Sequence, residues 1–239
     1  MQEILAIKDI LNAKDANVNY IGVTGFDSVD SHFSGFRKSD LCLVASSCSI
    51  LSFSFTIKIL HTLLFRHRCK ILFFSFNKFA GELVEDISKL CAEDENLDDK
   101  ELYIVDERGL NIRELIARAD MMFEVDAIVI DDISGIFDYW DKRRSKIFKK
   151  LKSYAVKHNI LVIVSGMEEK KVKNHKNADL MLISDRNCLG RCCDTIFFLD
   201  DSMTTDDGAG VWMSILRSRI DGSGLSVLFD YRHSQFHEY

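Results

Sequence analysis

Residues 46–53 stand where a phosphate-binding loop would hold its ligand, between an apolar run that predicts a buried strand and an apolar run that predicts a helix. In the pattern G-x-x-x-x-G-K-[ST], the second glycine lets the backbone close on the phosphates, the lysine neutralises them and the hydroxyl ligates Mg²⁺. In this frame those three places hold Leu51, Ser52 and Phe53. Taken alone, the segment is interpreted as a core strand and helix without a ligand. The candidate nucleotide-binding residues of this degenerate loop are Ser46, Ser47, Ser49, Ser52 and Phe53.

A pair of acids is the second chemical feature. Asp131 and Asp132 follow the apolar run AIVI, and carboxylate oxygen is the ligand type that Mg²⁺ prefers. The alternative is a polar strand end that caps the next turn.

Several segments around these features follow one another in an order typical of one family. They are GVTGFDSVDSHFSGFRKSDLCLVAS at 22–46, FFSFN at 73–77, AIVIDDI at 127–133, NILVIVSGM at 159–167, ILRSRIDGSG at 215–224 and LFDYRHSQFHE at 228–238. Together they resemble the motor domain of DnaB-type replicative helicases, and the first segment is the most specific. The likeness covers roughly residues 20 to 239.

The resemblance implies an α/β fold of the RecA-like P-loop NTPase type, with a mainly parallel central sheet flanked by helices and an antiparallel hairpin at the C-terminal edge. Residues 21–239 would form this domain and residues 1–20 a linker-like helix, without a primase-binding domain. The helix would pack on a neighbouring subunit or, alternatively, on its own core. Hydrophobic periodicity agrees. It predicts strands near 41–46, 70–76, 102–105, 126–131, 160–165, 195–199, 211–217 and 225–229, and helices near 2–12, 25–33, 53–66, 79–92, 111–122, 141–157 and 168–173.

The resemblance also identifies which catalytic groups are replaced. Asn77 stands at the family's water-orienting glutamate, and an amide cannot act as a base. Met167 stands at the sensor glutamine, and a thioether cannot report on a γ-phosphate through a strong hydrogen bond. Asp131 matches the aspartate that holds Mg²⁺. Lys78 is the lysine considered as a substitute for the lost one.

These replacements predict a lost ATPase, because losing one preorganised group commonly costs about 10² to 10³ in rate. We therefore expect no cofactor. ATP, with Mg²⁺ on Asp131, belongs to the alternative of a rebuilt nucleotide site.

Two arginines match a part that acts in trans. In the family, K-x-R on a late hairpin reaches the γ-phosphate in the neighbouring subunit's site, and Arg217 and Arg219 stand at those positions. Arginine keeps the charge and binds phosphate in a bidentate manner. A solvated strand face is the alternative.

Two basic segments are candidate DNA contacts, because the family's channel-lining loops lie near them. The alternative is a solvated helix face. The predicted contacts are Lys142, Arg143, Arg144, Lys170, Lys171 and Lys173.

Composition limits the other classes of function. The 239 residues are 47% hydrophobic and carry a net charge of −6, so the chain as a whole has no attraction for polyanions. No uninterrupted apolar run reaches membrane-spanning length, and we expect a cytoplasmic protein. Seven cysteines include Cys188, Cys192 and Cys193, whose spacing suits zinc badly, so reduced thiols are expected. The acid-rich segment 93–101 is interpreted as a solvated loop.

The functional hypothesis is a non-catalytic partner or regulator in DNA replication that joins or modulates a helicase ring. Its partners would be a replicative helicase ring or further copies of itself, together with single-stranded DNA. One alternative is an active ATP-dependent helicase motor with a rebuilt site. The other is a scaffold that binds neither ATP nor DNA.

Overall fold

The computed structural model describes residues 19–46, 48–122, 124–139, 144–167, 192–205, 208–218 and 224–238. The large sheet is built from β3 (Leu41–Ser46), β4 (Ile71–Ser75), β5 (Leu102–Val105), β6 (Ala127–Asp131), β7 (Leu161–Met167), β8 (Thr195–Thr205), β9 (Gly208–Arg217), β10 (Ser226–Arg232) and β11 (Gln235–Glu238). A small separate pair consists of β1 (Tyr20–Gly22) and β2 (Phe36–Arg37). The helices are α2 (Asp27–Asp30), α3 (Ser49–Phe65), α4 (Ala80–Ser88), α5 (Ile112–Asp120) and α6 (Arg144–His158).

Within the described residues the strand order is β11-β10-β9-β8-β3-β7-β6-β4-β5. The pairs from β8 to β5 are parallel, and β8, β9, β10 and β11 pair antiparallel. The mainly parallel sheet with an antiparallel C-terminal edge is therefore confirmed.

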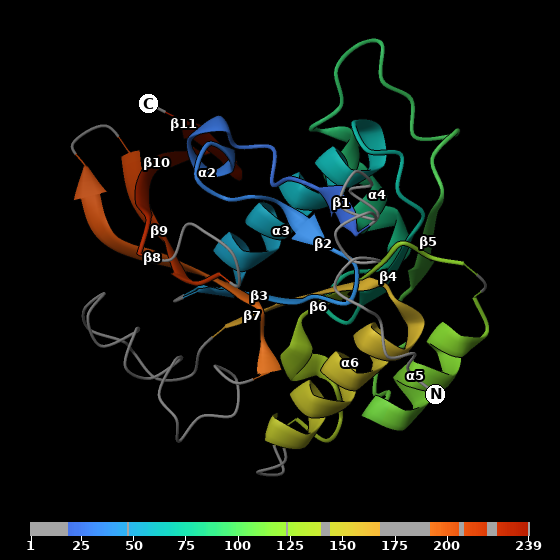
Figure 1. The fold of residues 1–239 in the computed structure, drawn as a ribbon. Helices are drawn as coiled ribbons and strands as arrows, with labels where there is room; N and C mark the ends of the chain where they lie inside the picture. Colours follow the sequence, from blue (N-terminus) through green and yellow to red (C-terminus); the bar gives the residue numbers. More distant parts are fainter. Residues whose placement is uncertain are drawn as a thin grey trace, which may run out of the picture.

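The helices cover the sheet on both faces, with α3 and α4 on one and α5 and α6 on the other (Figure 1). Strand β3 shows why both faces need cover, since its residues alternate between the two cores. Cys42 and Val44 belong to the α3 core, whereas Leu41, Leu43 and Ala45 belong to the α6 core.

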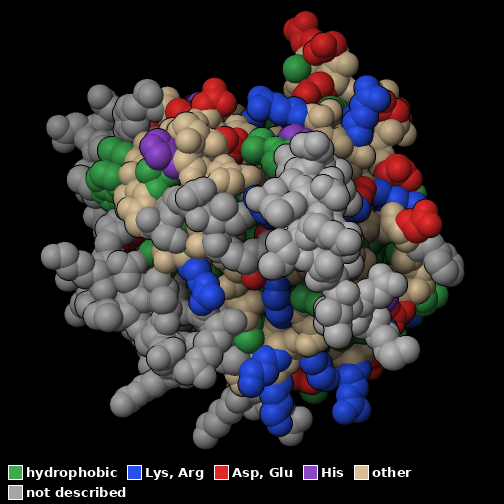
Figure 2. Space-filling model, viewed as in Figure 1, with side chains coloured by type: hydrophobic (Ala, Val, Ile, Leu, Met, Phe, Trp, Pro, Cys, Tyr) green, Lys and Arg blue, Asp and Glu red, His purple; other side chains and the backbone are tan. Residues whose placement is uncertain are grey.

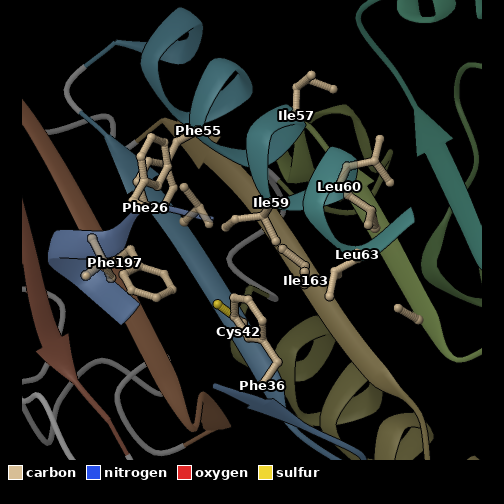
Figure 3. Close-up of a cluster of buried hydrophobic side chains, with 14 of the residues drawn as sticks. Phe26, Phe36, Cys42, Phe55, Ile57, Ile59, Leu60, Leu63, Ile163 and Phe197 are labelled. Atoms are coloured by element: carbon tan, nitrogen blue, oxygen red, sulfur yellow. The ribbon is translucent and has the colours of Figure 1, made fainter. Parts of the chain in front are cut away.

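Helix α3 is the centre of the first core, and aromatic rings join it to the chain's C-terminal strands. The ring of Phe55 stacks on Phe26 with 5.0 Å between centroids, and Phe26 meets Phe229 of β10 edge to face, also at 5.0 Å. Figure 3 shows Phe26, Phe55 and Phe197 gathered between α3 and the sheet. Such pairs add about 0.5 to 1.5 kcal/mol beyond their burial.

The segment that best resembles the helicase family has a structural role here. The carboxylate of Asp30 accepts hydrogen bonds from Thr24 N at 2.9 Å, Thr24 Oγ1 at 2.7 Å and Gly25 N at 2.8 Å. Gly25 has a positive φ of 89°, and a Cβ there would lie 2.0 Å from Thr62 Oγ1. The threonine, glycine and aspartate thus fix the entry to α2 against α3.

Several helix predictions differ from the structure in their bounds, including that for α4, which ends at Ser88 and not at residue 92. Helix α3 begins at Ser49, four residues before the predicted start at 53, because Leu51 packs as a core residue of its first turn. Helix α2 is only four residues long instead of 25–33, since Phe26 before it is extended and the helix ends at Asp30. The predicted helices 2–12 and 168–173 lie outside the described residues. Among the residues described, no helix has the length and apolar character needed to cross a bilayer.

Candidate functional site

The carboxyl ends of four neighbouring strands form one edge of the sheet, and several predicted site residues meet there. Ser46 at the end of β3 pairs with Met167 at the end of β7. Asp131 at the end of β6 pairs with Ser75 of β4, and Asn77 follows two residues later, exposed to solvent. The topology therefore brings Ser46, Met167, Asp131 and Asn77 to the same edge. Their chemical roles stay predictions.

We call the β3–α3 connection closed, because Leu51, at the place of the second glycine, packs into the core. Leu51 N donates to Cys48 O at 3.0 Å, so this amide serves the first turn of α3. The Leu51 side chain is 3% exposed and belongs to the α3 core. In a phosphate loop the corresponding backbone surrounds the ligand. Here the Leu51 amide is bonded within the first helical turn, and its side chain fills the core.

The serine hydroxyls of this segment also bind the protein's own backbone. Ser46 Oγ donates to Cys48 O across the connection, and Ser52 Oγ donates to Ser49 O at 3.0 Å. Both serines are buried. Ser49 begins the helix, while Ser47 lies outside the described residues.

A lysine does reach this region from β4, but it already has partners. Lys78 Nζ lies 4.3 Å from the centroid of the Phe53 ring and forms an ion pair with Asp86 of α4. Asp86 also pairs with Lys89 at 2.7 Å. Burial alone raises the pKa of Asp86, but the hydrogen bonds from Lys78 and Lys89 bring it below its ordinary value. Lys78 and Lys89 therefore share the single negative charge of Asp86.

Asp131 is a buried carboxyl, only 3% exposed. Burial, together with the neighbouring charge of Asp132, raises its pKa to about 7, although the Ser165 hydroxyl donates to Oδ1 and opposes the rise. Lys78 also opposes it through its charge. At mildly acidic pH this group is thus a neutral acid held by β7, which is a poor starting state for binding Mg²⁺.

Asp132 has the capping role considered as an alternative for the pair. Its Oδ1 accepts from Ser134 N at 2.9 Å and caps the short 3₁₀ turn Ile133–Gly135. The two adjacent acids therefore differ, since Asp131 contacts the next strand and Asp132 begins the next turn.

Arg217 lies at the opposite edge of the sheet. It pairs with Ile196 near the start of β8, whose neighbour Thr195 pairs with Cys42 near the start of β3. The side chain is half-buried. Arg217 is therefore remote from its own chain's Ser46. Arg219 lies outside the described residues.

The predicted DNA contacts Lys142, Arg143, Lys170, Lys171 and Lys173 lie outside the described residues. Arg144 is the first residue of α6, but its side chain is not among those described. Lys152, farther along α6, has a structural role, because its Nζ binds Asp194 at 2.5 Å and Ser39 O at 2.7 Å.

The rest of α6 presents a basic stripe, defined here as Lys146, Lys149, Lys150 and Lys157. Their spacing puts them on one side of the helix, and Figure 2 shows Lys and Arg side chains over α6 and α5 along the lower edge of the view. A groove of 430 Å³ beside it is lined by Arg113 and Ile116 of α5 and by Lys149, Lys150 and Lys157. Among the residues described, the four lysines of the stripe form no ion pair.

A larger pocket of 590 Å³ lies on the outer side of α3. Phe53, Lys58 and Lys78 line it together with His233 of the β10–β11 turn and His237 of β11. Its described lining includes neither Ser46 nor Asp131. A ligand there would contact Lys78 without reaching Asp131.

Sequence reasoning did not identify Ser165 or Asp86, the partners of Asp131 and Lys78. Ser165 has a weak signal, as a serine within the apolar run of β7. Asp86 has none, because it is one of many acids on an exposed helix. Both pairings depend on which elements lie side by side.

No protein-family model matches the chain, and no curated protein matches it. Solved structures match its fold closely. An ATPase domain superposes with a TM-score of 0.75 at 17% identity, covering 99% of this chain and 100% of that one. A DnaB-like replicative helicase, whose structure was described with its interactions with primase, gives 0.73 at 17% identity over 98% of this chain and 67% of that one. A KaiC-like protein from the hyperthermophilic archaeon Pyrococcus horikoshii gives 0.69 at 15% identity, covering 92% and 97%. At these identities the likeness shows the fold, which is the RecA-like fold of DnaB-type ATPase domains.

Proposed function

We propose that this chain is a DnaB-like helicase-domain protein of DNA replication that does not hydrolyse ATP and acts as a partner or regulator of a helicase. The observation that carries the proposal is the closed β3–α3 connection. At the place of the second glycine, Leu51 has a side chain packed in the core and an amide that already donates to Cys48 O.

Three further differences point the same way. The place of the phosphate lysine holds the buried Ser52, the place of the Mg²⁺-ligating hydroxyl holds Phe53, and the place of the catalytic glutamate holds Asn77. Phosphoryl transfer depends on positioning and on charge stabilisation. With these groups replaced and Lys78 paired to Asp86, we expect ATP hydrolysis to be absent.

The position of Arg217 supports a role in trans. It lies at the sheet edge opposite Ser46, and an arginine finger given to a neighbour's nucleotide is worth about 10³ to 10⁵ in rate. A chain that has lost its own site can still donate such a finger. The partner would be an active helicase subunit within a ring.

The experiment is a steady-state ATPase titration of the cognate helicase with this protein, with Arg217→Ala and with Arg219→Ala. We expect the helicase rate to be lower with either variant than with the wild type. Arg118→Ala is the matched control, because Arg118 is an exposed arginine of α5 that pairs with Glu107. Identical curves for wild type and finger variants would reject the finger, while a helicase rate unaffected by any of these proteins would favour a fold-only scaffold.

Single-stranded DNA is a second proposed ligand, and the basic stripe of α6 supports it. Lysines binding the phosphate backbone release counterions, so their affinity falls with salt. Fluorescence anisotropy at two salt concentrations should show weaker binding and a smaller salt slope for Lys149→Gln with Lys150→Gln. Lys70→Gln with Lys89→Gln removes the same charge elsewhere and should leave binding unchanged. Equal losses in both pairs would reject a specific stripe.

The alternative of an active motor with a rebuilt site gives a different result. It requires measurable turnover by the protein alone that disappears in Asp131→Ala. Calorimetric titration with Mg-ATP separates the two hypotheses directly, because the closed connection predicts no heat of binding.

A further inference from the structure

Three side chains of types that can bind a metal come from different segments and meet at α3. His61 belongs to α3, Cys91 follows α4, and Glu95 lies in the acid-rich segment after it. The imidazole, thiol and carboxylate donor atoms all lie within 4.8 Å of one another. His61 Nε2 and Glu95 Oε2 are 2.9 Å apart. This cluster includes none of the residues around Asp131, and the proposed function does not use it.

The surroundings hold the cluster in place. The His61 ring is largely buried and stacks on Phe65, with 4.5 Å between ring centroids. Glu95 also accepts a hydrogen bond from Ala92 N at 2.9 Å, which closes a local turn and holds the carboxylate beside His61. The segment expected to be a solvated loop therefore has one side chain directed at a buried histidine.

Two cations lie near the cluster and oppose the binding of a metal there. The charges of Lys58 and Arg66 both act on His61, and Lys58 lies one turn before it on α3. Burial and the charge of Arg66 lower the pKa of Lys58. A thiol gives up its proton when it binds a metal, and Cys91 would do so here.

We propose that His61, Cys91 and Glu95 form a binding site for a divalent transition metal of the zinc class, with the fourth position taken by water. An imidazole with a thiolate selects zinc-like ions over Mg²⁺ or Ca²⁺, which prefer oxygen alone. Tetrahedral zinc, with bonds of about 2.0 to 2.3 Å, places its ligand atoms about 3.5 Å apart. Moving the donors by about 1 Å reaches this spacing, and Glu95 lies on a loop that can follow.

The bound metal would join three segments and add to the hydrogen bond between His61 and Glu95. It would fasten the acidic segment between α4 and β5 to α3, the same helix whose first turn closes the β3–α3 connection. The expected consequence is a more stable α3 to α4 pair and slower proteolysis within residues 92–101.

The test is titration of the full chain with Co²⁺, followed by displacement with Zn²⁺. We expect one equivalent to give tetrahedral visible bands and a thiolate-to-cobalt charge-transfer band, both removed by Zn²⁺. Cys91→Ser should abolish the charge-transfer band and weaken Zn²⁺ binding by about 100-fold or more, since outer-sphere changes alone cost about 10- to 100-fold. Glu95→Gln should weaken binding while keeping the band.

Cys48→Ser is the matched control, because Cys48 is a half-buried thiol outside the cluster, and it should bind like the wild type. Circular dichroism checks that each variant is folded. The proposal is overturned if wild type gives no charge-transfer band, if Cys91→Ser keeps it, or if Cys192→Ser removes it instead. It is also overturned if Zn²⁺ raises the melting temperature of wild type and Cys91→Ser equally.

Discussion

The β3–α3 connection and the end of β6 lie at the same edge of the sheet but differ in their chemistry. At the β3–α3 connection Leu51 packs into the core. The hydroxyls of Ser46 and Ser52 donate to backbone carbonyls of the same segment. The end of β6, two strands away in the sheet, keeps two adjacent buried carboxyl groups, Asp131 and Asp132.

The difference shows two ways of satisfying polar groups at the carboxyl ends of the strands. A glycine-rich loop without a ligand leaves backbone groups unsatisfied, so a helical turn with a core side chain is the more stable solution. A buried acid can remain because protonation removes its charge and a hydroxyl satisfies it. Asp131 with Ser165 is such a case.

Restoring the phosphate loop should produce the largest effect. Leu51→Gly, Ser52→Lys and Phe53→Thr together should recover Mg-ATP binding in calorimetry, because glycine frees the backbone and lysine returns the charge. Hydrolysis should stay absent, since Asn77 has no carboxylate. Removing the buried Leu51 should also lower the free energy of unfolding by about 3 to 5 kcal/mol.

Denaturation of the triple variant and of Leu51→Ala alone separates these effects. The single variant should be destabilised without binding ATP. Rapid turnover by the triple variant would contradict the assignment of Asn77, and wild type binding Mg-ATP at micromolar concentration would contradict the closed connection.

Neutralising the retained acid should have the next largest effect. The pKa of Asp131 is raised from 3.8 to about 7 in the folded protein. A group with a raised folded pKa contributes stability that is complete below about pH 4 and is lost as pH rises through about 7. Asp131→Asn does not titrate, so its stability relative to wild type should increase by about 3 kcal/mol between pH 5 and pH 8.

Urea denaturation at both pH values measures this change. A difference between variant and wild type that is the same at pH 5 and pH 8 would mean that Asp131 is ionised throughout the range.

Removing the partner of that acid should have a smaller effect of opposite sign. Ser165→Ala deletes the hydroxyl that donates to Asp131 Oδ1 and should lower the free energy of unfolding by about 1 to 3 kcal/mol, because a buried group loses its hydrogen bond. In Ser165→Ala with Asp131→Asn the two effects should not add, since the residues are in contact. Additive values would place the hydroxyl elsewhere.

The smallest expected effect concerns Lys78. Lys78→Ala removes an ion pair with Asp86 and a contact with the Phe53 ring, which together should be worth about 0.5 to 1 kcal/mol. Lys89→Ala removes the more exposed partner of the same Asp86 and should cost less. A larger loss for Lys89→Ala in thermal denaturation would show that Lys78 is not held at the start of α3.

Periodicity predicted an α/β domain and most of its strands, and the resemblance carried by the motifs predicted the RecA-like fold. Two-residue alternation and short apolar runs are local properties, so 41–46 and 102–105 match the observed strands β3 and β5 at both ends. The missing lysine, hydroxyl and glutamate are also visible in the sequence, because they are matters of residue identity at fixed spacing.

Other features were decided by the tertiary structure. Helix α3 begins at Ser49 because Leu51 packs into the core. That core is formed in part by β7, β8 and the C-terminal strands. The two acids at the end of β6 take different roles because Ser165 lies on the adjacent strand. The meeting of His61, Cys91 and Glu95 depends on how α3 and α4 pack. The sequence lists these groups, and their contacts arise only when distant segments are brought together.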